Sequence, residues 1–156
     1  MFEVETREVP EQGVLSVQRN LYVNDLSPFI QETVARLYEH LTDTGLEPAG
    51  PCFVVYHNTV DEDSNGPAEV CLPYRGVAEP VGETRVRLEP AHREAYVRLT
   101  KGEVAFPGIL RAFDAVHDWV RAQGLEEAAP PREVYFADWA NVKGDDPACD
   151  VAWPVR

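Results

Sequence analysis

The most distinctive chemical feature of the sequence is a carboxylate beside aromatic residues in its second half. Glu133 stands two residues before Tyr135, in a segment, Glu133–Ala137, whose composition is typical of a strand. Because alternate residues of a strand point to one side, Glu133 and Tyr135 share a face, which Trp139 joins if the strand continues. Such a face suits an amphipathic cation or a planar dye-like ligand, since rings offer stacking area and the carboxylate one compensating charge.

Glu133 admits two other interpretations. An apolar pocket raises the pKa of a carboxyl group toward the working pH, so Glu133 could instead position or deprotonate a water molecule in a hydrolase. A solvated glutamate on an edge strand would have no chemical role, as is common for surface charges. The residues themselves leave these interpretations open.

Four further aromatic residues are candidates for ligand contact, because they stand near strand ends, near helix starts or in the strands of the second half. Such a residue is more often a core residue than a pocket residue. For Trp153 the two are evenly balanced, since strand periodicity does not say which face is covered. The four residues are Tyr22, Tyr56, Phe106 and Trp153.

Several motifs of metal and cofactor chemistry fail on inspection. The acidic segment 61–66 imitates the start of a calcium-binding loop, but its twelfth position is Leu72 instead of the required glutamate. The histidines show neither HxxxH nor HExxH spacing, and no glycine-rich phosphate loop is present. We therefore expect no metal site and no cofactor.

An internal repeat indicates which elements position these residues. A shift of 79 places residues 28–58 over residues 107–137, with Pro28 on Pro107 and Gly45 on Gly124. A shift of 81 places residues 69–74 over residues 150–155, and a shift of 80 places residue 17 over residue 97. The sequence therefore contains two copies of one unit.

Each copy contains a segment that is predicted to be a helix. In the first, Ser27 is the expected N-cap and Pro28 the first helical residue, where a missing N–H costs nothing, and Gly45 ends the helix. In the second, the helix is expected to start at Pro107 and to end at Gly124.

Segments rich in β-branched and aromatic residues surround both helices, so each copy is predicted to be a β-α-β-β unit. Two such units predict an α+β fold with one antiparallel sheet, two helices on one face and a ligand groove on the other. The predicted strands are Gly13–Gln18, Cys52–His57 and Ala68–Pro73 in the first copy, and Arg93–Leu99, Glu133–Ala137 and Cys149–Trp153 in the second.

The repeat also separates required residues from dispensable ones. Glu133 falls opposite Val54, so the scaffold tolerates an apolar residue there and folding does not demand the carboxylate. Trp153 likewise replaces Leu72 of the first copy. Glu69 and Asp150 are acidic in both copies, which favours a structural role for them.

Composition excludes several classes of partner. The chain carries 27 acidic and 14 basic residues, a net charge of −13, which repels phosphate backbones and argues against direct nucleic-acid binding. No apolar stretch approaches the roughly 20 residues of a membrane helix, and the N-terminus lacks the features of a secretory signal. Three widely spaced cysteines without a CxxC pair fit small buried residues in a reducing cytoplasm, the expected location.

With the repeat in hand, the chain resembles the GyrI-like effector-binding family over nearly its whole length. The resemblance rests on Glu69-Val70-Cys71-Leu72-Pro73, on Pro130–Tyr135 with its Glu-x-Tyr spacing, and on the duplicated order of elements. It implies a single domain, residues 1–156, with halves of about 1–80 and 81–156. It also implies capture of hydrophobic, often cationic, small molecules, with Glu133 matching the glutamate that accepts cationic drugs in the family's regulators.

The resemblance implies alternatives as well. Residues 1–156 leave no room for a helix-turn-helix reader, so we expect a stand-alone member of the family. Some stand-alone relatives hydrolyse cyclopropane-bearing genotoxins, a reaction in which Glu133 would activate water. Others modulate DNA gyrase, so that the acidic surface would contact a basic protein partner such as a topoisomerase, or a regulator.

Overall fold

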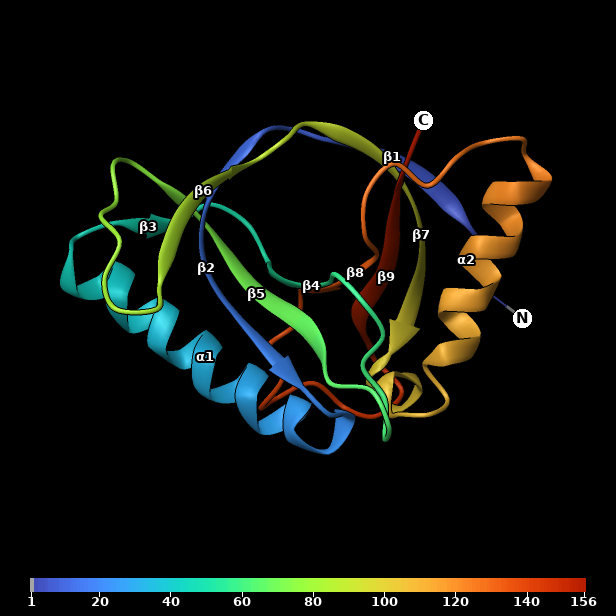
Figure 1. Ribbon diagram of the computed structural model, residues 1–156, viewed down its shortest axis with the longest axis horizontal. Coiled ribbons are helices and arrows are strands. Elements are labelled where there is room, and N and C mark those ends of the chain that lie inside the picture. The colour runs from blue at the N-terminus through green and yellow to red at the C-terminus, as the bar shows by residue number, and fades with distance from the viewer. Residues whose placement is uncertain (1) are drawn as a thin grey trace. The chain divides into compact units, whose positions relative to one another are not determined.

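The computed structural model describes residues 2–156, which form two compact units (Figure 1). The first unit comprises Glu11–Pro90, and the second joins the residues up to Pro10 to Ala91–Arg156. These units differ from the consecutive halves of about 1–80 and 81–156 expected from the repeat, because a strand at the start of each copy belongs to the other unit.

The first unit is an antiparallel sheet with one helix. Its strands lie in the order β6, β2, β5, β4, with the short strand β3 also paired to β5. The helix α1 packs against β2 and β5 (Figure 1). The bounds are β2 Gln12–Leu21, α1 Val23–Asp43, β3 Glu47–Pro48, β4 Cys52–Tyr56, β5 Gly66–Arg75 and β6 Arg85–Glu89.

The second unit repeats this arrangement. Its strands lie in the antiparallel order β1, β7, β9, β8, and the helix α2 packs against β7 and β9 (Figure 1). The α+β class and the repeated β-α-β-β order are thereby confirmed. The bounds are β1 Glu5–Val9, β7 His92–Thr100, a 3-10 turn η1 Lys101–Val104, α2 Leu110–Ala122, β8 Arg132–Tyr135 and β9 Pro147–Val155.

Both helices end where the sequence predicts and begin elsewhere. Gly45 and Gly124 follow them with φ values of 71° and 72°, a region that glycine enters without steric cost. The predicted start of α1 at Ser27 is wrong, because the helix already begins at Val23 and contains Pro28. The predicted start of α2 at Pro107 is also wrong, since the chain forms single turns before the regular helix begins at Leu110.

One face of each sheet is covered by its helix. In the second unit, alternate residues of β7 and β9 meet residues of α2 that recur at helical spacing, as an amphipathic helix on a sheet requires. The buried cluster consists of Ala95, Val97, Leu99, Ile109, Ala112, Val116, Val120, Val151 and Val155. On α1 the buried positions are Phe29, Thr33, Leu37 and Leu41.

The strands β1 and β6 are exchanged between the two units. A shift of 80 superposes β1 on β6 and β2 on β7, so β1 and β6 are equivalent strands that each precede the second strand of a copy. Yet β1 pairs with β7, and β6 pairs with β2. The sequence-based interpretation included neither strand and therefore missed the exchange.

Each exchanged strand carries an arginine that binds buried carboxylates. On β1, Arg7 donates from Nε to Glu94 Oε2 at 2.9 Å and from Nη1 to Asp150 Oδ2 at 2.7 Å. On β6, the equivalent Arg87 donates from Nε to Glu69 Oε2 at 2.8 Å. The acidic residues shared by both copies, Glu69 and Asp150, thus hold the exchanged strands, which is the structural role that the repeat favours.

Replacing either arginine by methionine should destabilise the protein strongly. Arg7→Met or Arg87→Met keeps most of the apolar stem but removes a guanidinium from buried carboxylates, although Asp150 retains Arg98. The free energy of unfolding should therefore fall by about 2 to 4 kcal/mol. Urea titration followed by circular dichroism measures this change. Arg156→Met is the matched control, because Arg156 and Glu126 form an exposed pair worth less than about 1 kcal/mol. Equal effects of all three substitutions would contradict the assignment.

Candidate functional site

Glu133 lies on β8 in the second unit and is buried, with 5% of its surface exposed. It stands opposite Val151 of β9, and directly opposed residues of an antiparallel pair project to the same side. Val151 belongs to the cluster packed on α2. The Glu133 side chain is therefore on the face of the sheet that bears the helix, and the interpretation as a solvated edge-strand glutamate is wrong.

Tyr135 and Trp139 extend the site from Glu133. The hydroxyl of Tyr135 donates a hydrogen bond to Glu133 Oε1 at 2.5 Å. The ring of Trp139 meets that of Tyr135 edge to face, with centroids 5.4 Å apart and an interplanar angle of 79°. Because β8 ends at Tyr135, Trp139 reaches the site from the turn after the strand. The structure thus brings together the three residues that the sequence groups.

A buried carboxylate, a phenol and an indole thus lie together at the end of β8, and none of them is a strong nucleophile. The neighbouring Cys149, opposite Tyr135, is buried. Burial and the charge of Glu133 raise the pKa of its thiol well above the usual value, so the thiol stays protonated. The thiol of Cys149 therefore adds no charge beside Glu133.

The other predicted aromatic residues lie in different surroundings. Trp153 packs beside the α2 cluster, with its ring centroid 5.7 Å from that of His117 on α2. Phe106 is an exposed residue of the loop before α2, and Tyr22 is the exposed N-cap of α1. Tyr56, at the end of β4, is half-buried and occupies the position equivalent to Tyr135. Ligand contact by these four residues stays a prediction.

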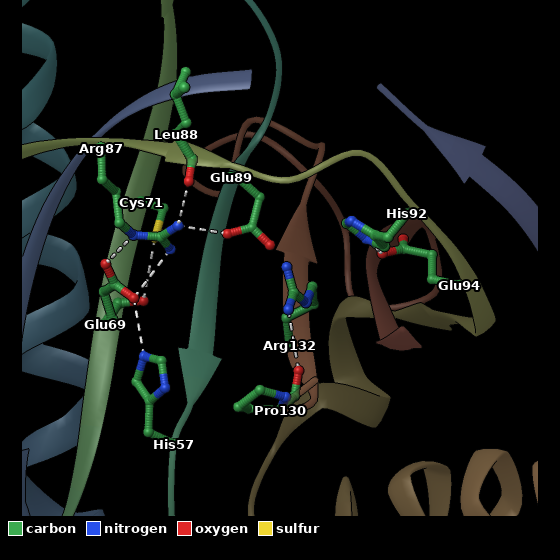
Figure 2. A network of polar contacts seen from close by, with 10 residues as sticks. All are labelled: His57, Glu69, Cys71, Arg87, Leu88, Glu89, His92, Glu94, Pro130 and Arg132. Atoms are coloured by element: carbon green, nitrogen blue, oxygen red, sulfur yellow. Dashed lines mark hydrogen bonds and ion pairs between the residues drawn. The ribbon is translucent and has the colours of Figure 1, made fainter. Parts of the chain in front are cut away.

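A second cluster in the first unit combines residue types that can do chemistry (Figure 2). Glu69 accepts hydrogen bonds from Arg87, and its Oε1 lies 2.9 Å from His57 Nε2. Figure 2 shows the Arg87 guanidinium between Glu69 and Glu89, with the Cys71 sulfur 3.5 Å from Nη2. Burial, reinforced by Glu69, raises the pKa of the Cys71 thiol well above its usual value, so this thiol is not a nucleophile.

The cluster therefore has a structural role, since it holds β6 in the sheet of the first unit. It has a counterpart in the second unit. There Glu94 binds Arg7. Its Oε1 also lies 2.7 Å from His92 Nε2 (Figure 2). Sequence reasoning missed both arginines, although a signal was present. The shift of 80 that aligns the strands also places Arg7 on Arg87 and Pro10 on Pro90.

Across residues 2–156, no three His, Cys, Asp or Glu side chains gather in a way that could hold a metal ion. Over the same residues, neither helix has the length and apolar character needed to cross a bilayer.

The chain belongs to the GyrI-like family. The family model that matches it is described as a GyrI-like small molecule binding domain, and the match spans residues 2–156. Small-molecule binding is thus the general function of the domain. No curated protein matches the chain in sequence.

Solved structures show the same fold. The C-terminal domain of EcmrR is 20% identical with a TM-score of 0.85, and the match covers all of this chain and 98% of that domain. In the EcmrR–DNA complex the TM-score is 0.84 at 20% identity, and the match covers 99% of this chain but only 57% of the EcmrR chain.

More distant structures include one with a bound molecule. SAV2435 bound to tetraphenylphosphonium is 13% identical with a TM-score of 0.58, covering 99% of this chain and 94% of that one. A hydrolase from Listeria innocua is 12% identical with a TM-score of 0.67, covering 99% and 92%. At these identities the likeness concerns the fold.

Acid should weaken the protein through Glu69. Burial alone would raise the pKa of Glu69, but hydrogen bonds from Arg87 and His57 lower it from an ordinary 4.5 to about 2. A depressed carboxyl pKa stabilises the folded state above pH 4.5, and this stabilisation is lost as the pH falls from there toward 2.

The urea midpoint, measured from pH 7 down to pH 3, should therefore fall less steeply in Glu69→Gln than in the wild type. Glu126→Gln, which alters an exposed carboxylate, should follow the wild type. Parallel curves for the wild type and Glu69→Gln would show that this carboxylate is not linked to acid unfolding.

Proposed function

We propose that this protein binds hydrophobic, cationic small molecules, and that Glu133 anchors their charge while Tyr135 and Trp139 contact their rings. The observation that carries the proposal is the buried carboxylate of Glu133 beside two aromatic rings that contact each other edge to face. Membership of a small-molecule-binding family supports it. The tetraphenylphosphonium bound to SAV2435, a structure of the same fold, is a ligand of this class.

The physical basis is the cost of keeping a charge away from water. A buried carboxylate has lost much of its hydration, so a cation that reaches it recovers more energy than it would at the surface. Aromatic rings add an attraction for positive charge and a large apolar contact area. A neutral ligand of the same shape gains only the apolar contact area. The preference for a cation over a neutral ligand should therefore depend on Glu133.

The same carboxylate supports hydrolysis as a second candidate function. A buried glutamate that accepts a hydrogen bond from a phenol is positioned to hold a water molecule against a bound electrophile, such as a strained cyclopropane ring. The electrophile's ring would open by addition of water, with the proton passing through the carboxylate. Turnover would distinguish this function from binding alone.

Glu133→Gln should reduce the affinity for a cationic dye selectively. Removing the buried charge should weaken rhodamine 6G by about tenfold to a hundredfold, the scale of a charged hydrogen bond, and should leave the neutral dye Nile red within about twofold. Fluorescence polarisation with purified protein gives both dissociation constants. Glu126→Gln, at an exposed glutamate, is the matched control and should bind both dyes as the wild type does.

The possible outcomes separate the candidate functions. Absence of dye binding by the wild type, or equal affinities of wild type and Glu133→Gln, would overturn the cation-binding proposal. Consumption of a cyclopropane-bearing compound that stops in Glu133→Gln while the compound still binds would establish the hydrolase instead.

Two tryptophan variants should separate ligand contact from core packing. Trp139→Leu removes the ring that contacts Tyr135, so both dyes should bind about fivefold to thirtyfold more weakly with little change in melting temperature. Trp153→Leu places the residue of the first copy in the α2 cluster, so it should mainly lower the melting temperature, by several degrees. The reverse pattern would identify Trp153 as the ligand contact.

A further inference from the structure

The loop that carries Trp139 is joined to the turn η1 by the side chain of Lys101 and by backbone hydrogen bonds. Lys101 Nζ donates to the backbone carbonyl of Trp139 at 2.8 Å and to that of Val142 at 3.4 Å. Two backbone hydrogen bonds join the same segments, from Lys101 N to Asp146 O at 3.1 Å and from Gly102 N to Gly144 O at 2.9 Å. The loop is therefore held to η1 at Trp139, at Val142 and close to the start of β9.

The backbone position of Lys101, the first residue of η1, is fixed by its neighbours in the sequence. η1 follows directly on β7, whose last core residue, Leu99, is fully buried. The backbone N–H of Thr100 donates to Glu103 Oε1 at 2.9 Å, which closes a capping box around the turn. The position of Lys101 is thus set by the core strand of the second unit.

The ammonium of Lys101 also lies 5.4 Å from the centroid of the Trp139 ring. This distance is within the range of a cation–π interaction, so one charged group contacts both the backbone and the ring of the same residue. The Trp139 ring in turn meets Tyr135, whose hydroxyl binds Glu133. A continuous chain of contacts runs from Lys101 to the carboxylate.

We propose that Lys101 is a positioning and specificity residue of the ligand site, an inference that rests on the proposed function. It holds the Trp139 ring against Tyr135 and so sets the affinity for any aromatic ligand, charged or neutral. Its own charge disfavours a second cation on the same ring, because like charges repel across a few ångströms in a medium of reduced dielectric. The charge of a ligand is thereby directed to Glu133.

Lys101→Met tests this role, because it keeps the stem and removes both the donor and the charge. Nile red should bind about fivefold to tenfold more weakly, since the ring is no longer held. Rhodamine 6G should lose less affinity, because repulsion is removed at the same time. Lys101→Arg keeps a charged donor and should stay within about twofold of the wild type for both dyes. Lys143→Met removes an exposed lysine of the same loop and is the matched control.

A double-mutant cycle distinguishes positioning from general loss of stability. If Lys101 acts through Trp139, Lys101→Met should have almost no further effect on Nile red in a Trp139→Leu background. Additive losses in the double variant would overturn the inference, as would wild-type affinities in Lys101→Met. Failure of the proposed function looks different, since then the wild type binds neither dye or Glu133→Gln retains the cationic one.

Discussion

Four buried carboxylates, Glu69, Glu89, Glu94 and Asp150, constrain how the chain is assembled. A buried carboxylate without a cation costs several kcal/mol, so each sheet requires a positive charge at a defined point. That charge arrives on β1 in one unit and on β6 in the other, as Arg7 and Arg87. Pairing a strand in the wrong place would remove these guanidinium contacts, although Asp150 would keep that of Arg98. Electrostatics, in addition to backbone hydrogen bonds, thus specifies the exchanged strands.

The repeat divides the residues into a shared scaffold and a departure from it. The glycine after each helix, the core positions and the arginine–carboxylate pairs recur in both copies, because the two units have the same fold. Glu133 does not recur, since its equivalent is the fully buried Val54. Burying a carboxylate costs desolvation free energy, and the other copy folds with an apolar residue at the same position. Such asymmetry within a duplicated fold is a physical reason to look there for function.

Much of this organisation could be predicted from the sequence, and what could not has identifiable causes. Periodicity and composition are local, so six strands, two helices and the glycine at the end of each helix were accessible. The pairing of β1 could not be predicted in this way. β1 is a five-residue strand with one notable arginine, and it pairs with β7, which is distant in the sequence. The grouping of Glu133, Tyr135 and Trp139 followed from strand alternation. The part played by Lys101 depends on loop hydrogen bonds, which carry no sequence period.

Glu69 and Glu133 also differ in the hydrogen-bond donors beside them. Glu69 is matched within its unit by a guanidinium, so its charge is neutralised when the chain folds. At Glu133 the donor is the neutral phenol of Tyr135, and this hydrogen bond orients one oxygen of the carboxyl group. The cationic ligand proposed for Glu133 would also be attracted at long range by the protein's net charge of −13.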